Sequence, residues 1–506
     1  MVPGPGGGES WIMKPHRPAL AALVLSLGAL IAAAPPSTSG PSTSSIPSSF
    51  SGPATPAGPA TPAGPATPAG PATPAAPGAS AARSPVPALD RAAHPLRTTD
   101  PRGDLDDLRS IGMMVNDATV VGLGEATHSS HEFFTMKQRV FRYLVENKGF
   151  RVFALEASWS TGQRLNDYVL HGVGDPAQIM RTEFQSTYVF WNNTEYLDLL
   201  RWMRGYNVQH PHDPVQFMGD DFAYAGPELY DKVAGYMAKT HPELLPRLTE
   251  LYRDLRPTTT PEAHMNTYPL RPLAELQEIA GRTGRALDLL KQAGPGKGGD
   301  VEAHAWAVRN VTAIDQTAKG YAFDPDDPGE AARAMRYRDQ IMADNVEWWQ
   351  RHTGSKVLLA AHNGHVALQS HDPQHYPKVQ GSFLRDKLGK HYVSIGSTFD
   401  GGSFNALDAD GRMAVHTVGP AKPGSNEYTL DKARPRDYVL DLRTAPNAAR
   451  DWLNTPRATW SIGGAYPGPT GPYKQIALAN SHDVLIHLHR VSPAHWLTAP
   501  TAPAGK

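Results

Sequence analysis

The chain has 506 residues and a formal net charge of -1, from 48 basic and 49 acidic side chains, and it contains no cysteine. This charge balance gives no electrostatic case for binding nucleic acid. The absence of cysteine excludes disulfides, thiolate catalysis, cysteine-based zinc sites and iron–sulfur clusters. The length suits one large α/β domain that carries insertions.

The first 34 residues have the layout of a secretory signal peptide. Lys14 and Arg17 precede an apolar run over residues 19–34, which ends in Ala32-Ala33-Ala34. A basic start, an apolar stretch and a small-residue cleavage site are typical of such leaders. The run is short for a membrane span, which needs ~20 apolar residues. We therefore predict a signal peptide over residues 1–34, secretion or cell-wall association, and no stable membrane insertion after cleavage. Retention of the segment as an anchor is the alternative.

Residues 35–85 consist mostly of Pro, Ala, Thr, Gly and Ser. A six-residue repeat, Gly-Pro-Ala-Thr-Pro-Ala, starts at Gly52, Gly58, Gly64 and Gly70. Proline at this density blocks helix and sheet, and the segment has little to bury. We predict a disordered linker over residues 35–85, a folded domain over 86–495 and a disordered tail over 496–506.

The folded domain opens with a strand–helix–strand pattern. A strand is expected over residues 118–123, and Ser129 with Glu132 fits a capping box that begins a helix. Apolar residues with 3-4-4 spacing from Phe133 continue this helix, and Gly149 ends it. A second strand follows over residues 151–155. Such a unit predicts two paired parallel strands with a right-handed crossover.

The remaining pattern predicts further strands and a helical insertion. Helices are expected over residues 104–114, 165–170, 196–206, 243–255, 273–292, 302–317 and 330–350. Strands are expected over 215–218, 356–361, 392–397, 413–418, 438–442 and 484–489, with a hairpin near 408–411. We predict an α/β fold with a mainly parallel central sheet flanked by helices and an inserted helical subdomain at about 240–352. Gly- and Pro-rich stretches over 419–435 and 463–472 suggest mobile loops at the rim of a site.

Ionisable side chains follow several of these apolar strands. They are Glu125 with His128, Glu156, Asp220 with Asp221, and His362 with His365. Ligands of open parallel sheets bind at the carboxyl ends of the strands. Any one of these residues alone could be a helix cap or a surface charge, but their recurrence at strand ends predicts one shared site.

Histidine and carboxylate at these positions indicate acid–base chemistry. His128 is the candidate general base, because histidine titrates near neutrality. Glu125 or Glu156 could fix its tautomer. His362 and His365 could hydrogen-bond an oxyanion or bind metal, although no metal-binding signature such as H-E-x-x-H occurs. Arg338 could clamp the substrate or form a surface salt bridge.

Two other site types fit the sequence less well. No Gly-x-Ser-x-Gly motif occurs, which argues against a serine hydrolase of the nucleophile-elbow type. Gly122-x-Gly124-x-x-Thr127 nearly matches a dinucleotide-binding turn. However, Glu125 would repel the pyrophosphate, and the third glycine is replaced by Thr127.

The order of the motifs resembles the erythromycin esterase family. The matching residues are Gly122 to His128 with Glu132-Phe133, Gly149-Phe150, Ala154-Leu155-Glu156, Trp191-x-Asn193-x-Glu195, Gly219-Asp220-Asp221, Arg338-Asp339-x-x-Met342-Ala343 and Ala361-His362-Asn363-x-His365-Val366. The resemblance covers about residues 90–495. It implies an α/β fold with a deep cleft and hydrolysis of a cyclic ester, such as a macrolide lactone, without metal or cofactor.

The resemblance also implies roles for individual residues. The base is His128, and the other catalytic residues are Glu125, Glu156, His362 and His365. A basic residue that the family keeps, usually arginine, is Lys137 here, where the bidentate geometry of arginine is lost. The candidate substrate-binding residues are Arg338, Lys137, Asp220 and Trp191.

These observations predict a secreted esterase that opens a lactone or similar ester and could inactivate an antibiotic. The expected partner is a small-molecule ester or lactone, and we expect a monomer that does not bind nucleic acid. Two alternatives remain open: a non-catalytic protein that binds the cell envelope, and a metal-dependent envelope hydrolase of related fold.

Overall fold

The computed structural model of the protein describes residues 84–296, 299–469 and 473–498. The predicted signal peptide over 1–34, nearly all of the predicted linker and the end of the predicted tail lie outside the described residues. Described residues from Pro85 onward belong to one compact unit. No described helix is long and apolar enough to cross a membrane.

A sheet of nine strands organises the described residues. The strands are β1 (His94–Pro95), β2 (Val120–Leu123), β3 (Phe150–Ser158), β4 (Gln216–Asp221), β5 (Lys356–Ala360), β6 (Tyr392–Leu407), β7 (Met413–Val418), β8 (Tyr438–Asp441) and β11 (Val484–Val491). Their order is β1-β8-β11-β6-β2-β5-β3-β4, and β7 pairs with β6. The six strands from β11 to β4 are parallel neighbours, whereas β1, β7 and β8 pair antiparallel. The predicted mainly parallel sheet is confirmed.

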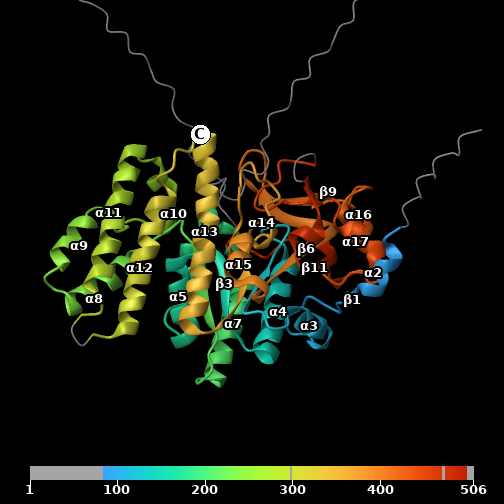
Figure 1. Ribbon diagram of the computed structural model, residues 1–506, viewed down its shortest axis with the longest axis horizontal. Helices are drawn as coiled ribbons and strands as arrows, with labels where there is room; N and C mark the ends of the chain where they lie inside the picture. The colour runs from blue at the N-terminus through green and yellow to red at the C-terminus, as the bar shows by residue number, and fades with distance from the viewer. Residues whose placement is uncertain (1–83, 297–298, 470–472, 499–506) are drawn as a thin grey trace, which may run out of the picture. The chain divides into compact units, whose positions relative to one another are not determined.

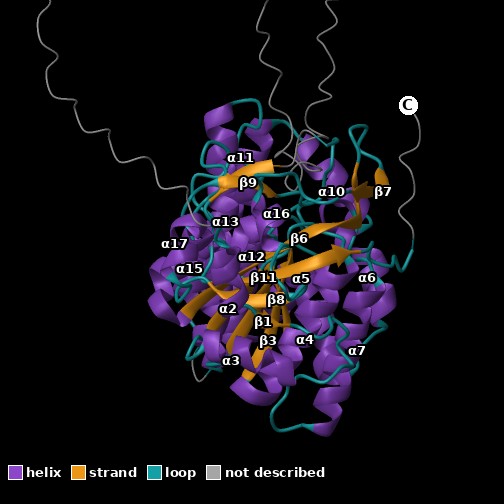
Figure 2. Ribbon diagram, turned by 90° about the vertical axis from the view of Figure 1, so that its right-hand side faces the viewer, coloured by secondary structure: helices purple, strands orange, loops and turns teal. Residues whose placement is uncertain are grey.

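Helices cover both faces of this sheet (Figure 2). The first set is α2 (Val86–Ala92), α3 (Arg109–Val115), α4 (His131–Lys148), α5 (Trp159–His171), α6 (Pro176–Glu183) and α7 (Thr194–Gln209). Side chains alternate along each strand, so Val121 and Leu123 join one hydrophobic core while Val120 joins the other. Burial on both faces explains why these strands read as continuous apolar runs.

The predicted pairing of the first two parallel strands is wrong. β5 lies between β2 and β3 and pairs in parallel with both. Its sequence lies about two hundred residues after theirs, so no local pattern could place it there. The position of β5 matters for function, because it places the residues that follow β5 between those that follow β2 and β3.

The predicted capping box at the start of α4 is also wrong. Ser130 is the N-cap residue, and no side chain caps the helix. Glu132 instead accepts hydrogen bonds from the backbone N–H (2.6 Å) and the hydroxyl (2.7 Å) of Ser492. The predicted stop is correct, since Gly149 ends the helix with a positive φ of 71°.

The helical insertion begins earlier than predicted. It comprises α8 (Pro227–Thr240), α9 (Leu245–Leu251), α10 (Pro261–Thr267), α11 (Leu273–Ala293), α12 (Val301–Gly320) and α13 (Pro328–Thr353). Helices α8, α9, α11 and α12 gather at one side of the domain, and the long α13 lies between them and the sheet (Figure 1). Trp349 on α13 is buried in the core that covers this face.

The C-terminal part contains elements that the sequence did not predict. They are the two-stranded sheet of β9 (Arg457–Trp460) and β10 (Tyr473–Ile476), and the short helices α14 (Asn363–Val366), α15 (Gln380–Leu388), α16 (Asn426–Leu430), α17 (Asn447–Leu453) and α18 (Leu478–Ser481). β6 is longer than predicted, and the hairpin to β7 is confirmed. Of the predicted rim loops, the first contains α16, and residues 470–472 of the second lie outside the described residues.

Candidate active site

The carboxyl ends of β2, β5 and β3 meet at one place. After β5, the backbone N–H of Asn363 donates to the carbonyl of Glu125 (2.8 Å). The neighbouring backbone N–H, that of His362, donates to the side chain of Glu156 (3.1 Å). The segment after β5 is therefore hydrogen-bonded to both flanking strand ends. Gly124 permits this approach, because a β-carbon there would overlap Asn363.

His128 is held by a buried carboxylate. Its Nδ1 lies 2.9 Å from Oε1 of Glu125, and the other oxygen of Glu125 accepts from the Lys137 ammonium. Because a carboxylate can only accept, neutral His128 carries its proton on Nδ1 and leaves the Nε2 lone pair available. Burial lowers the pKa of Lys137, although Glu125 opposes this shift. The structure thus shows that the partner of His128 is Glu125, a choice that the sequence left open between Glu125 and Glu156.

Aromatic side chains fix the orientation of the His128 ring. Phe190 stacks on it at a centroid distance of 5.4 Å, and Trp191 contacts it edge-on at 5.2 Å. The Trp191 indole N–H also donates to the backbone carbonyl of Glu156 (2.8 Å). Trp191 therefore links the strand end that carries Glu156 to the imidazole.

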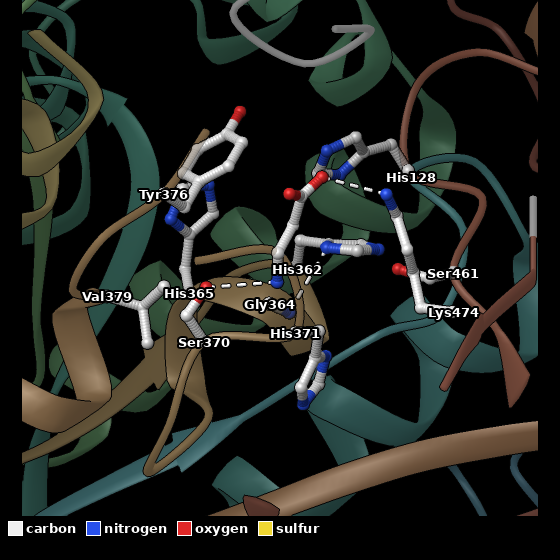
Figure 3. A pocket seen from close by; sticks show the side chains of 12 residues that line it. His128, His362, Gly364, His365, Ser370, His371, Tyr376, Val379, Ser461 and Lys474 are labelled. Carbon is white, nitrogen blue, oxygen red and sulfur yellow. Dashed lines mark hydrogen bonds and ion pairs between the residues drawn. The ribbon is translucent and has the colours of Figure 1, made fainter. Parts of the chain in front are cut away.

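His362 presents a buried hydrogen-bond donor to the same place. Its Nδ1 accepts from the backbone N–H of Gly364 (3.1 Å), and its buried Nε2 has no partner among the described residues. Burial, together with the nearby His128 and His365, lowers the pKa of His362 well below its usual range. His362 is therefore neutral with its proton on Nε2. Its ring centroid lies 5.2 Å from that of His128, and Figure 3 shows both rings at the same hollow.

Arg338 is buried among carboxylates. Its guanidinium donates to Glu156 (2.8 Å) and, through two nitrogens, to Asp221 (2.6 and 3.1 Å). Although burial favours the neutral acid, His365 and Arg338 hold the pKa of Glu156 well below its usual range. The predicted alternative of a surface salt bridge is wrong, since Arg338 is 2% exposed.

His365 belongs to this charged network. Its Nδ1 lies 2.7 Å from Asp339, and its Nε2 lies 3.3 Å from the Glu156 oxygen that Arg338 also contacts. Burial opposes protonation, but Asp339 and Glu156 raise the pKa of His365 to about 10. Protonated Nε2 of His365 donates to Glu156. Arg338 also donates to Glu156, and this shared acceptor brings a guanidinium nitrogen of Arg338 to 3.1 Å from Nε2 of His365. His365 therefore acts as a fixed cation in this site.

The titration of His365 predicts a dependence of stability on pH. Its pKa is about 10 in the folded chain and about 6.5 in the unfolded chain. The folded state then binds more protons between these values, so the contribution of His365 is complete below pH ~6.5 and is lost as pH rises through ~10. Urea unfolding at a series of pH values measures this decline. In His365→Gln the decline should be shallower, and an identical slope in both proteins would contradict the assignment.

Two hollows flank His128, with cavity volumes of about 40 and 30 Å³. One is lined by His128, His362, His365, His371, Tyr376 and Lys474 among others, and the second by residues including Glu156, Tyr188, Phe190, Trp191 and Arg338. Sequence reasoning missed Phe190, His371, Tyr376 and Lys474. For His371 and Tyr376, the only local sign was the polar loop 370–376, shortly after His365.

Two predicted substrate-binding residues do not line these hollows. Lys137 is 1% exposed and is paired with Glu125. Asp220 is fully buried and accepts from the side chain of Gln380 (2.7 Å). Burial and the charge of Asp221 raise the pKa of Asp220 well above its usual range. Both side chains are buried beneath the site and do not reach the hollows.

The nitrogen atoms of the site are poorly arranged for a metal. His365 uses both ring nitrogens in the charged network, and Nδ1 of His362 accepts a backbone hydrogen bond. A neutral imidazole that binds metal through Nε2 keeps its proton on Nδ1, but Nδ1 of His362 already accepts the N–H of Gly364. The arrangement suits hydrogen bonding to a reacting oxygen.

The family model for erythromycin esterase matches residues 145–491 of the chain. The chain belongs to the erythromycin esterase family. A curated relative, erythromycin esterase type II of Escherichia coli, is 24% identical over 388 residues, which are 70% of this chain and 90% of that protein. Family membership and this relative make the chain an ester-bond hydrolase.

Solved structures of similar proteins share the fold. A Bacillus cereus protein of known crystal structure is 32% identical with a TM-score of 0.74, covering 81% of this chain and 97% of that one. A protein described as a succinoglycan biosynthesis protein is 30% identical with a TM-score of 0.72, covering 83% and 99%. A mutant of the erythromycin esterase EreC, in its open conformation, has a TM-score of 0.60 at 18% identity, covering 79% of this chain and 98% of that one.

Proposed function

We propose that this family member hydrolyses a cyclic ester of the macrolide lactone type, with His128 as the base that activates water. One observation carries the proposal: the Nδ1 proton of His128 is directed to Glu125, which leaves Nε2 as the base, and His362, with its proton on Nε2, lines the same hollow as His128. A base and an electrophilic donor at one hollow are the two groups that ester hydrolysis requires.

The reaction follows from this geometry. Nε2 of His128 removes a proton from a water molecule that attacks the ester carbonyl, and Glu125 stabilises the resulting imidazolium. The developing oxyanion accepts a hydrogen bond from His362. The imidazolium then returns its proton to the leaving alkoxide as the carbon–oxygen bond of the ring breaks. Because the alcohol stays tethered in a lactone, the product is one open-chain hydroxy acid that is heavier by one water.

The macrolide assignment is supported by the name of the Escherichia coli relative. The solved structure described as a succinoglycan biosynthesis protein points instead to ester chemistry on a polysaccharide. We would incubate the purified full chain with a panel of macrolides and acylated polysaccharides and analyse the products by mass spectrometry. A macrolide that gains one water supports the proposal. Release of acyl groups from polysaccharide alone would overturn the macrolide assignment, and no turnover of any ester would overturn the proposed hydrolysis.

The role of His362 gives a specific prediction. Replacing His362 with Phe removes the Nε2–H donor, and loss of one oxyanion donor lowers kcat by about 10²–10³. KM should change little, because the hydrogen bond strengthens as charge develops in the transition state. His362→Gln keeps an N–H donor and should retain more activity than His362→Phe. Equal kcat in both variants, with unchanged thermal melting, would contradict the oxyanion role.

We also propose that the chain is exported. The basic start and the apolar run over residues 19–34 support this proposal. N-terminal sequencing of protein from the culture medium and the cell wall would test it. A mature N-terminus close to Pro35 is expected, and finding only an uncleaved chain inside the cell would contradict it.

A further inference from the structure

A cluster of two histidines and one glutamate lies outside the catalytic site. His131 is the first residue of α4, Glu195 lies in the first turn of α7, and His495 follows β11. Nδ1 of His131 lies 2.6 Å from Oε1 of Glu195, and Nδ1 of His495 lies 2.7 Å from the same oxygen. Three elements that are distant in sequence thus direct two imidazoles and a carboxylate to one point.

We propose that these three residues bind a divalent transition-metal ion of the zinc class. Two imidazole nitrogens and one carboxylate oxygen form a ligand set that such ions prefer, and metal binding would release the protons that the two Nδ1 atoms now direct to Glu195. The three ligand atoms lie within 4.8 Å of one another. With metal–ligand bonds of about 2.0–2.2 Å, tetrahedral ligands are separated by roughly 3.4 Å. The side chain of His495 is 67% exposed, so it is free to make this small adjustment and leaves a fourth position for water.

The charge around this cluster favours a cation. The carboxylates of Glu132 and Asp100 add negative charge near His131. By contrast, a second group with comparable spacing, Asp400, Asp431 and His489, already contains a cation. The guanidinium of Arg436 lies 3.1 Å from Asp431 and 3.2 Å from His489. We therefore assign the metal site to His131, Glu195 and His495 alone.

The metal ion would link residues 492–495 to the turn that carries His128, the proposed catalytic base. Backbone hydrogen bonds already connect these parts: His131 N–H donates to Ser492, and Thr194 N–H donates to His495, both at 2.8 Å. His131, the first residue of α4, follows His128 of the β2–α4 connection by three residues. Closing the three ligands around one ion would hold this connection, α7 and residues 492–495 together. The proposed role is structural, since the cluster does not line either hollow beside His128.

Metal binding to the purified full chain, free of any affinity tag, tests this assignment. Isothermal titration of the chelator-treated protein with Zn²⁺ should show one site, and Co²⁺ should give the visible absorption of a bound ion. His495→Ala should weaken Zn²⁺ binding about 100-fold or more, since even loss of outer-shell partners costs 10–100-fold. Zn²⁺ should raise the Tm of the native protein and leave that of the variant unchanged. Because His495 is exposed, the variant is expected to fold.

Two further variants make the result specific. His489→Ala removes a partly buried histidine from the second cluster, Asp400, Asp431 and His489, and should bind Zn²⁺ as the native chain does. His128→Asn should also bind normally, which separates this site from the catalytic one. Unchanged Zn²⁺ binding in His495→Ala, or no binding by the native chain, would overturn the proposal. Loss of binding in His128→Asn but not in His495→Ala would place the metal in the catalytic site and overturn it as well.

Discussion

Replacing His128 with Asn should lower kcat/KM for the ester substrate by about 10²–10⁴, the usual contribution of a general base. An asparagine amide can still donate to Glu125, so the buried carboxylate keeps a partner. No lone pair then remains where Nε2 stood, and water is not activated. The variant should fold with little change in Tm. Steady-state hydrolysis, followed by mass spectrometry or by titration of the released acid, measures the effect.

A matched histidine variant controls for this result. His210 lies at the exposed end of α7 and stacks on Tyr206, away from both hollows. His210→Asn should therefore retain the native kcat/KM. If His128→Asn keeps full turnover while folded, another group activates the water and the assignment of the base is wrong.

Replacing Arg338 with Met should lower the free energy of unfolding by about 3–5 kcal/mol. Arg338 contacts both Glu156 and Asp221, and all three side chains are almost fully shielded from water. Removing the guanidinium leaves two buried carboxylates short of a positive charge, which His365 offsets only in part. Urea unfolding at neutral pH measures this loss. Methionine fills similar volume, so the effect reports charge more than packing.

A surface arginine on the same helix provides the control. Arg333 on α13 pairs with Glu330, and its side chain is 60% exposed. Exposed ion pairs contribute about 0–1 kcal/mol, so Arg333→Met should fall in that range. If Arg338→Met is no more destabilising than Arg333→Met, the network around Glu156 does not stabilise the fold, and Arg338 has another role.

Much of the fold could be read from local pattern. The apolar runs that became β2, β3, β4 and β5 were identifiable because strands buried on both faces are continuously apolar. The helix from His131 to Lys148 and its glycine stop followed from spacing and from the conformational freedom of Gly149. Short elements were missed, including α14 and β9, because four or five residues carry too little periodicity to distinguish them from loops.

In the candidate site, too, local pattern predicted some features and missed others. Ionisable residues after apolar strands were sufficient to predict that His128, Glu156, His362 and His365 lie close together, because parallel strands direct their carboxyl ends to one edge. The capping-box assignment of Glu132 failed for the opposite reason. Its actual partner, Ser492, is 360 residues away and could not enter a local argument.

The sequence by itself determined which chemistry the chain can carry: histidine and carboxylate at strand ends, no thiol and no serine elbow. The tertiary structure decided how these groups work together. β5 entered between β2 and β3, and the contacts of Nδ1 place the proton of neutral His128 on Nδ1 and that of His362 on Nε2. The proton position depends on the hydrogen bond that Nδ1 makes, and this bond is set by the folded geometry even though both partners are near in sequence. The sequence therefore determined which histidines and carboxylates are present, and the folded structure determined which ring nitrogen of His128 and of His362 carries the proton.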